Sequence, residues 1–373
     1  MNVPFVDLRP GVYSRDMQAE IDAAIKRVAY SGYYVLGPEV AAFEQAFAAY
    51  HGVQYAIGVA NGTDAIELAL RCLYDTDMHR RDEVITVGFT AVPTVCAIER
   101  AGLKPVLVDI DPWTYTMNVE DAIAAITPRT LAILPVHLYG MPAQLERMSM
   151  IAMAHGIHLV EDCAQACGAS WEGGKHVGTL GIMGCFSFYP TKTLGAMGDG
   201  GCIITNDDEY AYRVRLLRQY GQAKGKYLSL CGGGMNSRLD ELQAAVLSVK
   251  LKYLDAMNRE RRNLATLYKE MLPDGSYPWE WIEDGHVYHL FVIKHEDRDA
   301  LKEYLASKGV QTMIHYPHPV HLQPAYRHLA LAGSLPNSEE AAECVLSLPL
   351  YPGMLDEHVE YVCECIREWE KSR

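Results

Sequence analysis

The sequence predicts an α/β protein with a large domain built on a mostly parallel seven-stranded sheet, followed by a small C-terminal α+β domain. Up to residue 207, short apolar runs alternate with amphipathic helical patterns, as in parallel sheets covered by helices on both faces. Beyond residue 207 the pattern changes to longer helices. A Pro-, Gly- and Trp-containing stretch at 273–283 then predicts a domain boundary. A chain of 373 residues has room for both domains.

The seven expected strands are short runs of apolar, often β-branched residues. Amphipathic patterns of helical period separate most of them. Ligands of such sheets bind beyond the carboxyl ends of the strands, where Asp162 and the turn 60–64 are expected to lie. The strands are predicted at 55–59, 83–87, 105–109, 131–135, 158–161, 185–188 and 202–205, and the helices at 65–74, 92–101, 119–125 and 145–155.

The second half of the chain predicts a large-domain helical region and then the small domain. Apolar spacing predicts one or two long helices over 238–271, after a helix at 208–220. We therefore expect domains at 1–272 and 273–373, with about the first 25 residues packing beside the small one. Its predicted elements are a strand at 287–293 and helices at 297–308, 339–347 and 356–369.

Composition narrows the classes of partner. The net charge of −14 disfavours nucleic acid and anionic membranes, so a phosphate-bearing ligand needs a local cluster of donors. The ten cysteines form no CxxC pair, which predicts no metal site and fits a reducing cytoplasm. The N-terminus lacks the basic and apolar segments of a signal peptide, and no apolar run is long enough to span a bilayer.

A lysine and an aspartate carry the main chemical signal. Lys192 lies in a loop of Gly, Pro and Thr between two apolar strands, and Asp162 ends a strand about thirty residues earlier. Such a pair is what a pyridoxal phosphate site needs, because the cofactor requires an amine and a carboxylate beside its pyridine nitrogen. Taken alone, Lys192 also fits a solvated surface residue, and Asp162 also fits a helix N-cap.

Four further residues fit around such a cofactor. Thr63, next to Gly62 at a helix start, and Ser187 are candidate phosphate donors. Gln165 can hydrogen-bond the phenolic oxygen, and Phe89 can stack on the ring. Without a ligand, the segment around Thr63 also fits an ordinary capped helix start, and Phe89 also fits a plain core aromatic.

Three later segments complete the candidates. Asn236 precedes Ser237, which is expected to cap a helix, and offers a donor for an anion. Lys224 and Lys226 form a basic loop that can meet a substrate diphosphate, although charged loops are usually solvated. Three histidines and three prolines at 315–326 predict an extended loop beside a substrate pocket, without the spacing of a metal site.

Taken together, these segments resemble the pyridoxal phosphate-dependent nucleotide-sugar aminotransferases of the DegT type. Jointly they are specific for that family, although none is specific alone, and they extend over nearly the whole chain. The similar segments are 4–8, 32–40, 60–65, 137–140, 161–166, the Lys192 loop, 236–241 and 315–317.

The resemblance implies an aspartate aminotransferase-like (type I) fold and a homodimer with shared active sites. Tyr189, a lysine of the Lys224 and Lys226 pair, and His315 resemble substrate-pocket positions of enzymes that aminate C3 of a dTDP-linked 3-keto-6-deoxyhexose. For the cofactor it implies Lys192 as the covalently attached lysine, Asp162 at the pyridine nitrogen, Gln165 near the phenolic oxygen, Gly62, Thr63 and Ser187 at the phosphate, Phe89 on the ring and Asn236 from the second subunit.

The expected activity is amine transfer from L-glutamate to a nucleotide-linked ketosugar. Relatives that dehydrate sugars carry histidine where this chain has Lys192, so the lysine favours transamination. Aminotransferases of UDP-ketosugars or cyclitols share these segments and remain alternatives. A regulator that uses the fold without turnover is a third hypothesis, disfavoured by the intact Asp162 and Lys192 pair.

Overall fold

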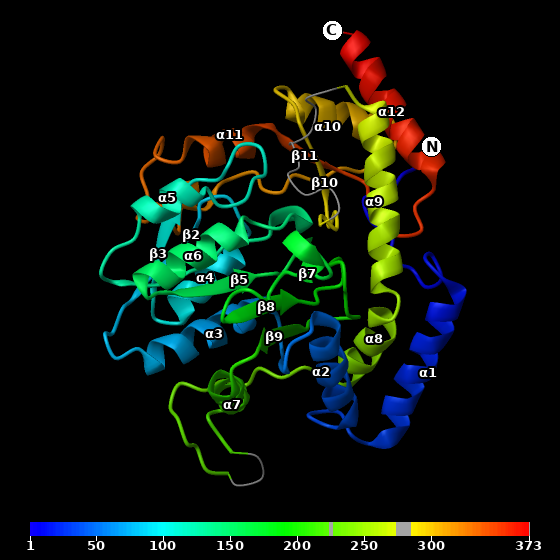
Figure 1. The fold of residues 1–373 in the computed structure, drawn as a ribbon. Coiled ribbons are helices and arrows are strands. Elements are labelled where there is room, and N and C mark those ends of the chain that lie inside the picture. The colour runs from blue at the N-terminus through cyan, green and yellow to red at the C-terminus, as the bar shows by residue number, and fades with distance from the viewer. Residues whose placement is uncertain (224–226, 274–284, 373) are drawn as a thin grey trace.

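The computed structural model describes residues 1–223, 227–273 and 285–372, and its centre is a seven-stranded sheet (Figure 1). The strand order is β1-β9-β8-β5-β4-β2-β3. The strands span Tyr55–Val59 (β1), Glu83–Val87 (β2), Lys104–Val108 (β3), Thr130–Ile133 (β4), His158–Asp162 (β5), Met183–Ser187 (β8) and Gly201–Thr205 (β9).

Strand direction brings the two chemical signals to one edge of the sheet. β5 runs parallel to β8, with Asp162 opposite Cys185. β9 runs antiparallel to both of its neighbours, and its first residue, Gly201, pairs with Ser187 at the end of β8. The loop that carries Lys192 therefore leaves and re-enters the sheet at the edge where β5 ends. The predicted mostly parallel sheet is confirmed.

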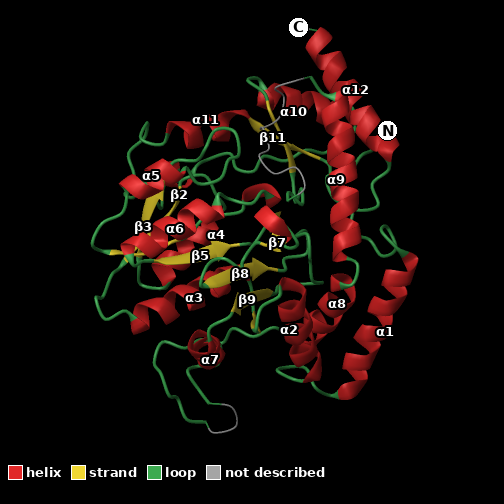
Figure 2. Cartoon of the chain, in the orientation of Figure 1, coloured by secondary structure: helices red, strands yellow, loops and turns green. Residues whose placement is uncertain are grey.

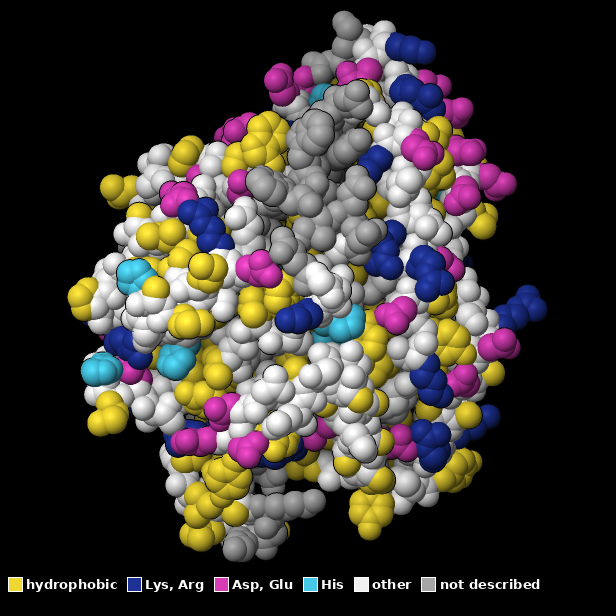
Figure 3. Space-filling view, viewed as in Figure 1, with side chains coloured by type: hydrophobic (Ala, Val, Ile, Leu, Met, Phe, Trp, Pro, Cys, Tyr) yellow, Lys and Arg dark blue, Asp and Glu magenta, His cyan; other side chains and the backbone are white. Residues whose placement is uncertain are grey.

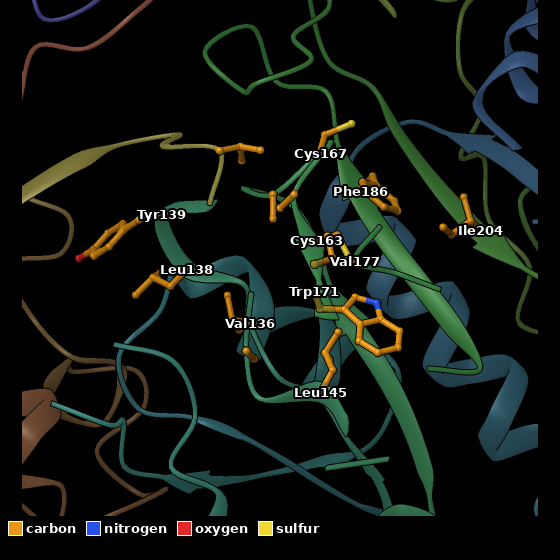
Figure 4. Packing of buried hydrophobic residues seen from close by; sticks show 14 of the residues in the cluster. Val136, Leu138, Tyr139, Leu145, Cys163, Cys167, Trp171, Val177, Phe186 and Ile204 are labelled. Carbon is orange, nitrogen blue, oxygen red and sulfur yellow. The ribbon is translucent and has the colours of Figure 1, made fainter. Parts of the chain in front are cut away.

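Helices cover both faces of this sheet (Figure 2). Alternate residues of a strand point to opposite faces, so Cys185 and Ile203 pack with α3 and α7, while Phe186 and Ile204 pack with α2 and α6. Figure 4 shows part of the apolar cluster on the face that carries Phe186, which also includes Trp171. The covering helices are α2 (Pro38–His51), α3 (Gly62–Thr76), α4 (Val92–Arg100), α5 (Val119–Ala124), α6 (Leu145–His155) and α7 (Asp208–Leu217).

A helical layer lies along one side of the molecule, where α1 (Arg15–Ser31) packs against α8 (Glu241–Leu251) and α9 (Leu254–Met271) continues toward the C-terminal helix (Figure 1). The expected start of this region was wrong. Ser237 caps no helix: its hydroxyl accepts a hydrogen bond from the Ala60 N–H. Instead, Glu241 is the first residue of α8, and its buried carboxylate accepts hydrogen bonds from the free N–H groups at the start of α2.

The C-terminal part has its own apolar cluster, built on a two-stranded antiparallel sheet of β10 (Phe291–Lys294) and β11 (Val345–Leu348). The expected helix over 339–347 was wrong at its end, over 345–347. The helix ends at Cys344, and Val345–Leu348 is a strand because the buried β10 offers it backbone partners. The helices here are α10 (Arg298–Ser307), α11 (Pro336–Cys344) and α12 (Asp356–Lys371).

Short elements complete the chain and bear on its division into domains. Val3 pairs with Val310 in the C-terminal part, whereas α1 packs on α8. Because α9 contributes to both regions, the division into 1–272 and 273–373 stays a proposal.

Among the described residues, no helix is long and apolar enough to cross a membrane. The short elements are β6 (Ser170–Trp171), β7 (Lys175–His176) and 3₁₀ turns at Leu138–Gly140, Glu172–Gly174 and Val320–Leu322.

Candidate active site

A cavity of about 270 Å³ lies at the carboxyl edge of the sheet, and we call it the Lys192 cavity. It forms where β1, β5 and β8 end, which is where ligands of parallel sheets bind. Most of the residues predicted from the sequence line it: Gly62, Thr63, Asp162, Gln165, Ser187, Tyr189 and Lys192.

The start of α3 forms one wall of this cavity. Asn61 caps the helix by accepting the Asp64 N–H at 2.8 Å, and Thr63 lies in its first turn. A Cβ atom on Gly62 would lie 2.7 Å from the Ser187 Cβ, so only glycine lets the helix start approach the end of β8 this closely. The N–H groups of a helix start, with two hydroxyls beside them, form a site that suits a phosphate.

The Gly62→Ala change is expected to weaken cofactor binding by roughly 10-fold, because the added methyl group forces α3 away from Ser187. Equilibrium titration of the cofactor-free protein with pyridoxal phosphate measures this. Gly232→Ala is the matched control, since its Cβ would have no atom within 4 Å. Equal affinity of Gly62→Ala and the unchanged protein would contradict the phosphate assignment.

The Asp162 carboxylate lies at the end of β5 and is only 3% exposed. It accepts hydrogen bonds from the Thr94 hydroxyl at 2.8 Å and from the Ala164 N–H at 3.1 Å. Burial raises the pKa of Asp162, while these two bonds and the charge of Lys192 oppose that rise. No ion pair to Asp162 occurs within the described part of the chain. A buried carboxylate that lines a cavity without a paired cation suits a ligand with a basic ring nitrogen.

The Lys192 amine enters the same cavity from the loop between β8 and β9. Burial lowers the pKa of Lys192 to about 8, although Asp162 opposes the shift. The loop is tight: the Lys192 N–H donates to the Tyr189 carbonyl at 2.8 Å, and a Cβ on Gly195 would lie 2.2 Å from the Pro190 oxygen. A substantial fraction of the amine is therefore neutral near pH 8, as a nucleophile or proton carrier requires.

The pKa of about 8 predicts how cofactor uptake depends on pH. Below pH 8 the ammonium form of Lys192 predominates and cannot attack an aldehyde, so the covalent uptake rate is expected to rise about tenfold per pH unit and level off above pH 8. Stopped-flow absorbance of the cofactor-free protein mixed with pyridoxal phosphate measures the rate. A rate that still rises steeply at pH 10, as for an ordinary lysine, would contradict the lowered pKa.

Gln165 is held in place by two tyrosines. Its carbonyl oxygen accepts the Tyr139 N–H at 2.8 Å, and its amide donates to the Tyr316 hydroxyl at 2.9 Å. Sequence reasoning assigned no role to Tyr316 or Thr94. Tyr316 stands in the 315–317 segment that carried the family resemblance, and Thr94 lies in the first turn of α4, the helix that follows β2, so both had a detectable signal.

Other predicted residues do not line the Lys192 cavity. Phe89 is fully buried, with ring contacts to Tyr115 and Tyr316, so its stacking on a ligand stays a prediction. Asn236 is exposed, in a bridge to Gln219. His315 lies with its Nδ1 2.9 Å from the Ser347 hydroxyl oxygen, and burial lowers its pKa to about 4. Lys224 and Lys226 lie outside the described residues.

The cavity fits pyridoxal phosphate. It combines a helix start and two hydroxyls for a phosphate, a buried carboxylate for a pyridinium nitrogen and a partly neutral amine for an aldehyde. When bound, this cofactor supplies an electron sink beside the reacting carbon.

Comparison with known proteins identifies similar proteins over the whole chain. The model of the DegT/DnrJ/EryC1/StrS aminotransferase family matches residues 15–367. A dTDP-3-amino-3,6-dideoxy-α-D-galactopyranose transaminase of Aneurinibacillus thermoaerophilus is 46% identical, covering 98% of this chain and 99% of that protein. A pleiotropic regulatory protein of Geobacillus stearothermophilus is 43% identical (99% of each chain). A UDP-N-acetyl-3-dehydro-α-D-glucosamine 3-aminotransferase of Acidithiobacillus ferrooxidans is 40% identical (98% and 97%).

Solved structures agree with this placement. DesV of S. venezuelae, crystallised with a ketimine intermediate, matches with a TM-score of 0.93 and 43% identity over 99% of this chain and 98% of that one. NtdA of Bacillus subtilis, solved with bound cofactor PMP, matches with a TM-score of 0.86 and 31% identity over 97% and 85%. The chain therefore belongs to the DegT/DnrJ/EryC1/StrS family and is an aminotransferase that uses pyridoxal phosphate.

Proposed function

We propose that the enzyme transfers the amine of L-glutamate to C3 of a dTDP-linked 3-keto-6-deoxyhexose. Glutamate then leaves as 2-oxoglutarate, and the sugar leaves as a 3-amino sugar. The observation that carries this proposal is the shared cavity of Lys192, Asp162 and the phosphate cradle. The choice of a dTDP-sugar is supported by the name of the Aneurinibacillus relative at 46% identity.

Each residue of the cavity has a distinct part in this proposal. Lys192 attaches the cofactor and, once freed, moves a proton to and from the amine-bearing carbon, a task that its pKa of about 8 suits. Asp162 keeps the ring nitrogen protonated through charge and burial. Gly62, Thr63 and Ser187 hold the phosphate, and Gln165 lies near the phenolic oxygen.

We further propose a homodimer, in which Asn236, Lys224 or Lys226 reach the partner's site. The exposed position of Asn236 outside its own cavity supports this. So does the loop after α7, which projects from the molecule in Figure 1 and carries the exposed apolar residues Leu228 and Tyr227, the latter 95% exposed. Figure 3 shows apolar side chains on the surface in this region. Free cysteines throughout support a cytoplasmic location.

We assign the substrate contacts to Tyr189 and His315. Tyr189 lines the cavity and is about half exposed, which suits a contact to the sugar. His315 is proposed to contact substrate as a neutral imidazole, since its lowered pKa keeps it uncharged at neutral pH.

Two alternatives have support of their own. The Acidithiobacillus relative acts, by its name, on a UDP-linked sugar, so a UDP-ketosugar is the main competing acceptor, with a cyclitol as a third. The Geobacillus relative is named a pleiotropic regulatory protein, so a regulatory role is the other alternative. The buried Asp162 and the Lys192 amine in one cavity favour catalysis over that role.

A panel of acceptors tests the proposed function. The enzyme is first converted to its aminated cofactor form with L-glutamate, and then dTDP- and UDP-linked 3-ketosugars and a ketocyclitol are compared. We expect the dTDP-sugar to restore the aldehyde absorbance with the highest kcat/KM and to yield a 3-amino sugar by mass spectrometry. Faster reaction with another acceptor would replace the proposed substrate, and no reaction with glutamate would favour the regulator.

A further inference from the structure

A second cavity lies on the other side of the Lys192 loop. It has a volume of about 380 Å³ and is enclosed by the N-terminal segment 7–13, the start of α1, the Lys192 loop, α8 and α9. Lys192 lines both cavities, so the two cavities meet at this residue. We call it the Arg261 cavity.

The wall of the Arg261 cavity is strongly cationic. Lys192, Lys250, Arg261 and Arg9 line it, against one carboxylate, Asp7. That carboxylate already accepts two hydrogen bonds from the Arg9 Nε at 2.9 and 3.0 Å. Asp7 therefore pairs with Arg9, and no carboxylate of this wall is left for Lys192, Lys250 and Arg261, in a protein whose net charge is −14.

Arg261 is the most informative of these cations. It is 6% exposed, its Nε has no hydrogen-bond partner, and its Nη1 lies 3.4 Å from the Leu350 carbonyl oxygen. Lys250 is half-buried, and its amine donates to the Gly195 carbonyl at 2.7 Å. Neither makes an ion pair with any carboxylate that the structure describes.

A buried and a half-buried cation without counter-ions lower the stability of the folded protein. Burial lowers the pKa of Arg261 to about 10 and also lowers that of Lys250, which shows how poorly their surroundings stabilise positive charge. A carboxylate brought by a ligand would form charge-assisted hydrogen bonds with these groups and remove that cost.

We propose that the Arg261 cavity binds the two carboxylates of the dicarboxylate amino donor, with Arg261 and Lys250 as their partners. This assignment rests on the proposed function, in which glutamate supplies the amine. Two unpaired cations match the two carboxylates of the donor, whereas an acidic sugar would bring one. The shared position of Lys192 then places the donor's amine at the edge of the Lys192 cavity.

Calorimetric titration of the cofactor-loaded enzyme with glutarate, a dicarboxylate that has no amine to transfer, tests the proposal directly. We expect Arg261→Met to lower glutarate affinity by roughly 10- to 100-fold and Arg261→Lys to retain part of it. Arg259→Met is the matched control, because Arg259 is exposed on the same helix and does not line the cavity. Glucuronate serves as the comparison ligand for an acidic sugar.

Half-reactions separate this proposal from the proposed function. Arg261→Met is expected to raise the KM for glutamate while leaving discharge of the aminated cofactor by the ketosugar unchanged. The donor site would be overturned if Arg261→Met bound glutarate with unchanged affinity, or if Arg259→Met lost as much glutarate affinity. It would also be overturned if the binding of glucuronate, but not that of glutarate, depended on Arg261. Glutarate binding that depends on Arg261 in an enzyme inactive toward every nucleotide sugar would uphold the site and refute the function. If Arg261→Met lacks native circular dichroism, Lys250→Met carries the same binding test.

Discussion

Replacing Lys192 by alanine is expected to abolish amine transfer. The side chain supplies both the amine that attaches the cofactor and the group that moves the proton, and loss of a general acid-base group alone costs roughly 10²- to 10⁴-fold. The rate of 2-oxoglutarate formation from glutamate measures the loss. We also expect the variant to lose its cofactor on gel filtration, because only non-covalent contacts remain, from Gly62, Thr63, Ser187, Asp162 and Gln165.

A matched control distinguishes loss of this amine from loss of a lysine in general. Lys252→Ala removes a lysine whose exposed amine pairs with Glu20, outside both cavities, and is expected to keep full activity. Turnover by Lys192→Ala at the rate of the unchanged enzyme would refute the assignment of the site.

The Asp162→Asn change is expected to lower kcat by roughly 10²- to 10³-fold. Asparagine keeps the size of the side chain but removes the buried counter-charge, so the protonated form of the ring nitrogen loses its stabilisation; breaking a buried charge pair costs about 3–5 kcal/mol. The rate constant of the glutamate half-reaction, followed by cofactor absorbance, measures this. Because the amide cannot hold the nitrogen protonated, we also expect the cofactor's absorbance to become more sensitive to pH.

Thr94→Val gives the comparison for this prediction. It removes one hydrogen bond to Asp162 and keeps the charge, so we expect a loss of roughly 10-fold or less. If the two variants lose activity equally, the hydrogen bond rather than the carboxylate charge would be the essential feature. An unimpaired Asp162→Asn variant would remove Asp162 from the proposed mechanism.

Much of the candidate site could be predicted because its residues follow strands directly. Asp162, Ser187 and Thr63 stand at or just after the ends of β5, β8 and β1, and parallel strands bring their carboxyl ends to one edge. Lys192 followed from the same pattern, since its loop joins two adjacent strands. The residues proposed for the cofactor could therefore be predicted from local sequence patterns.

Contacts between distant segments could not be predicted in this way. Ser237 reads as a helix cap, yet Glu241 occupies the start of α8 and caps α2, about two hundred residues earlier in the chain. The stretch Val345–Leu348 continues a helical pattern but forms a strand because β10 lies beside it. In both places a partner from elsewhere in the fold outweighs a local preference.

The sequence by itself determined the class of fold, the pairing of Asp162 with Lys192 at one edge of the sheet, and the helix start that we propose for the phosphate. It did so because strand period, helix period and the residues after strand ends are local properties of the chain. Only the tertiary structure decided that β9 runs antiparallel and that Thr94 and Tyr316 support the site. It also decided that Arg261 is buried and Lys250 half-buried without counter-ions, in a cavity that Lys192 also lines. Burial and pairing of charge depend on which distant segments meet, and that is set by packing of the whole chain.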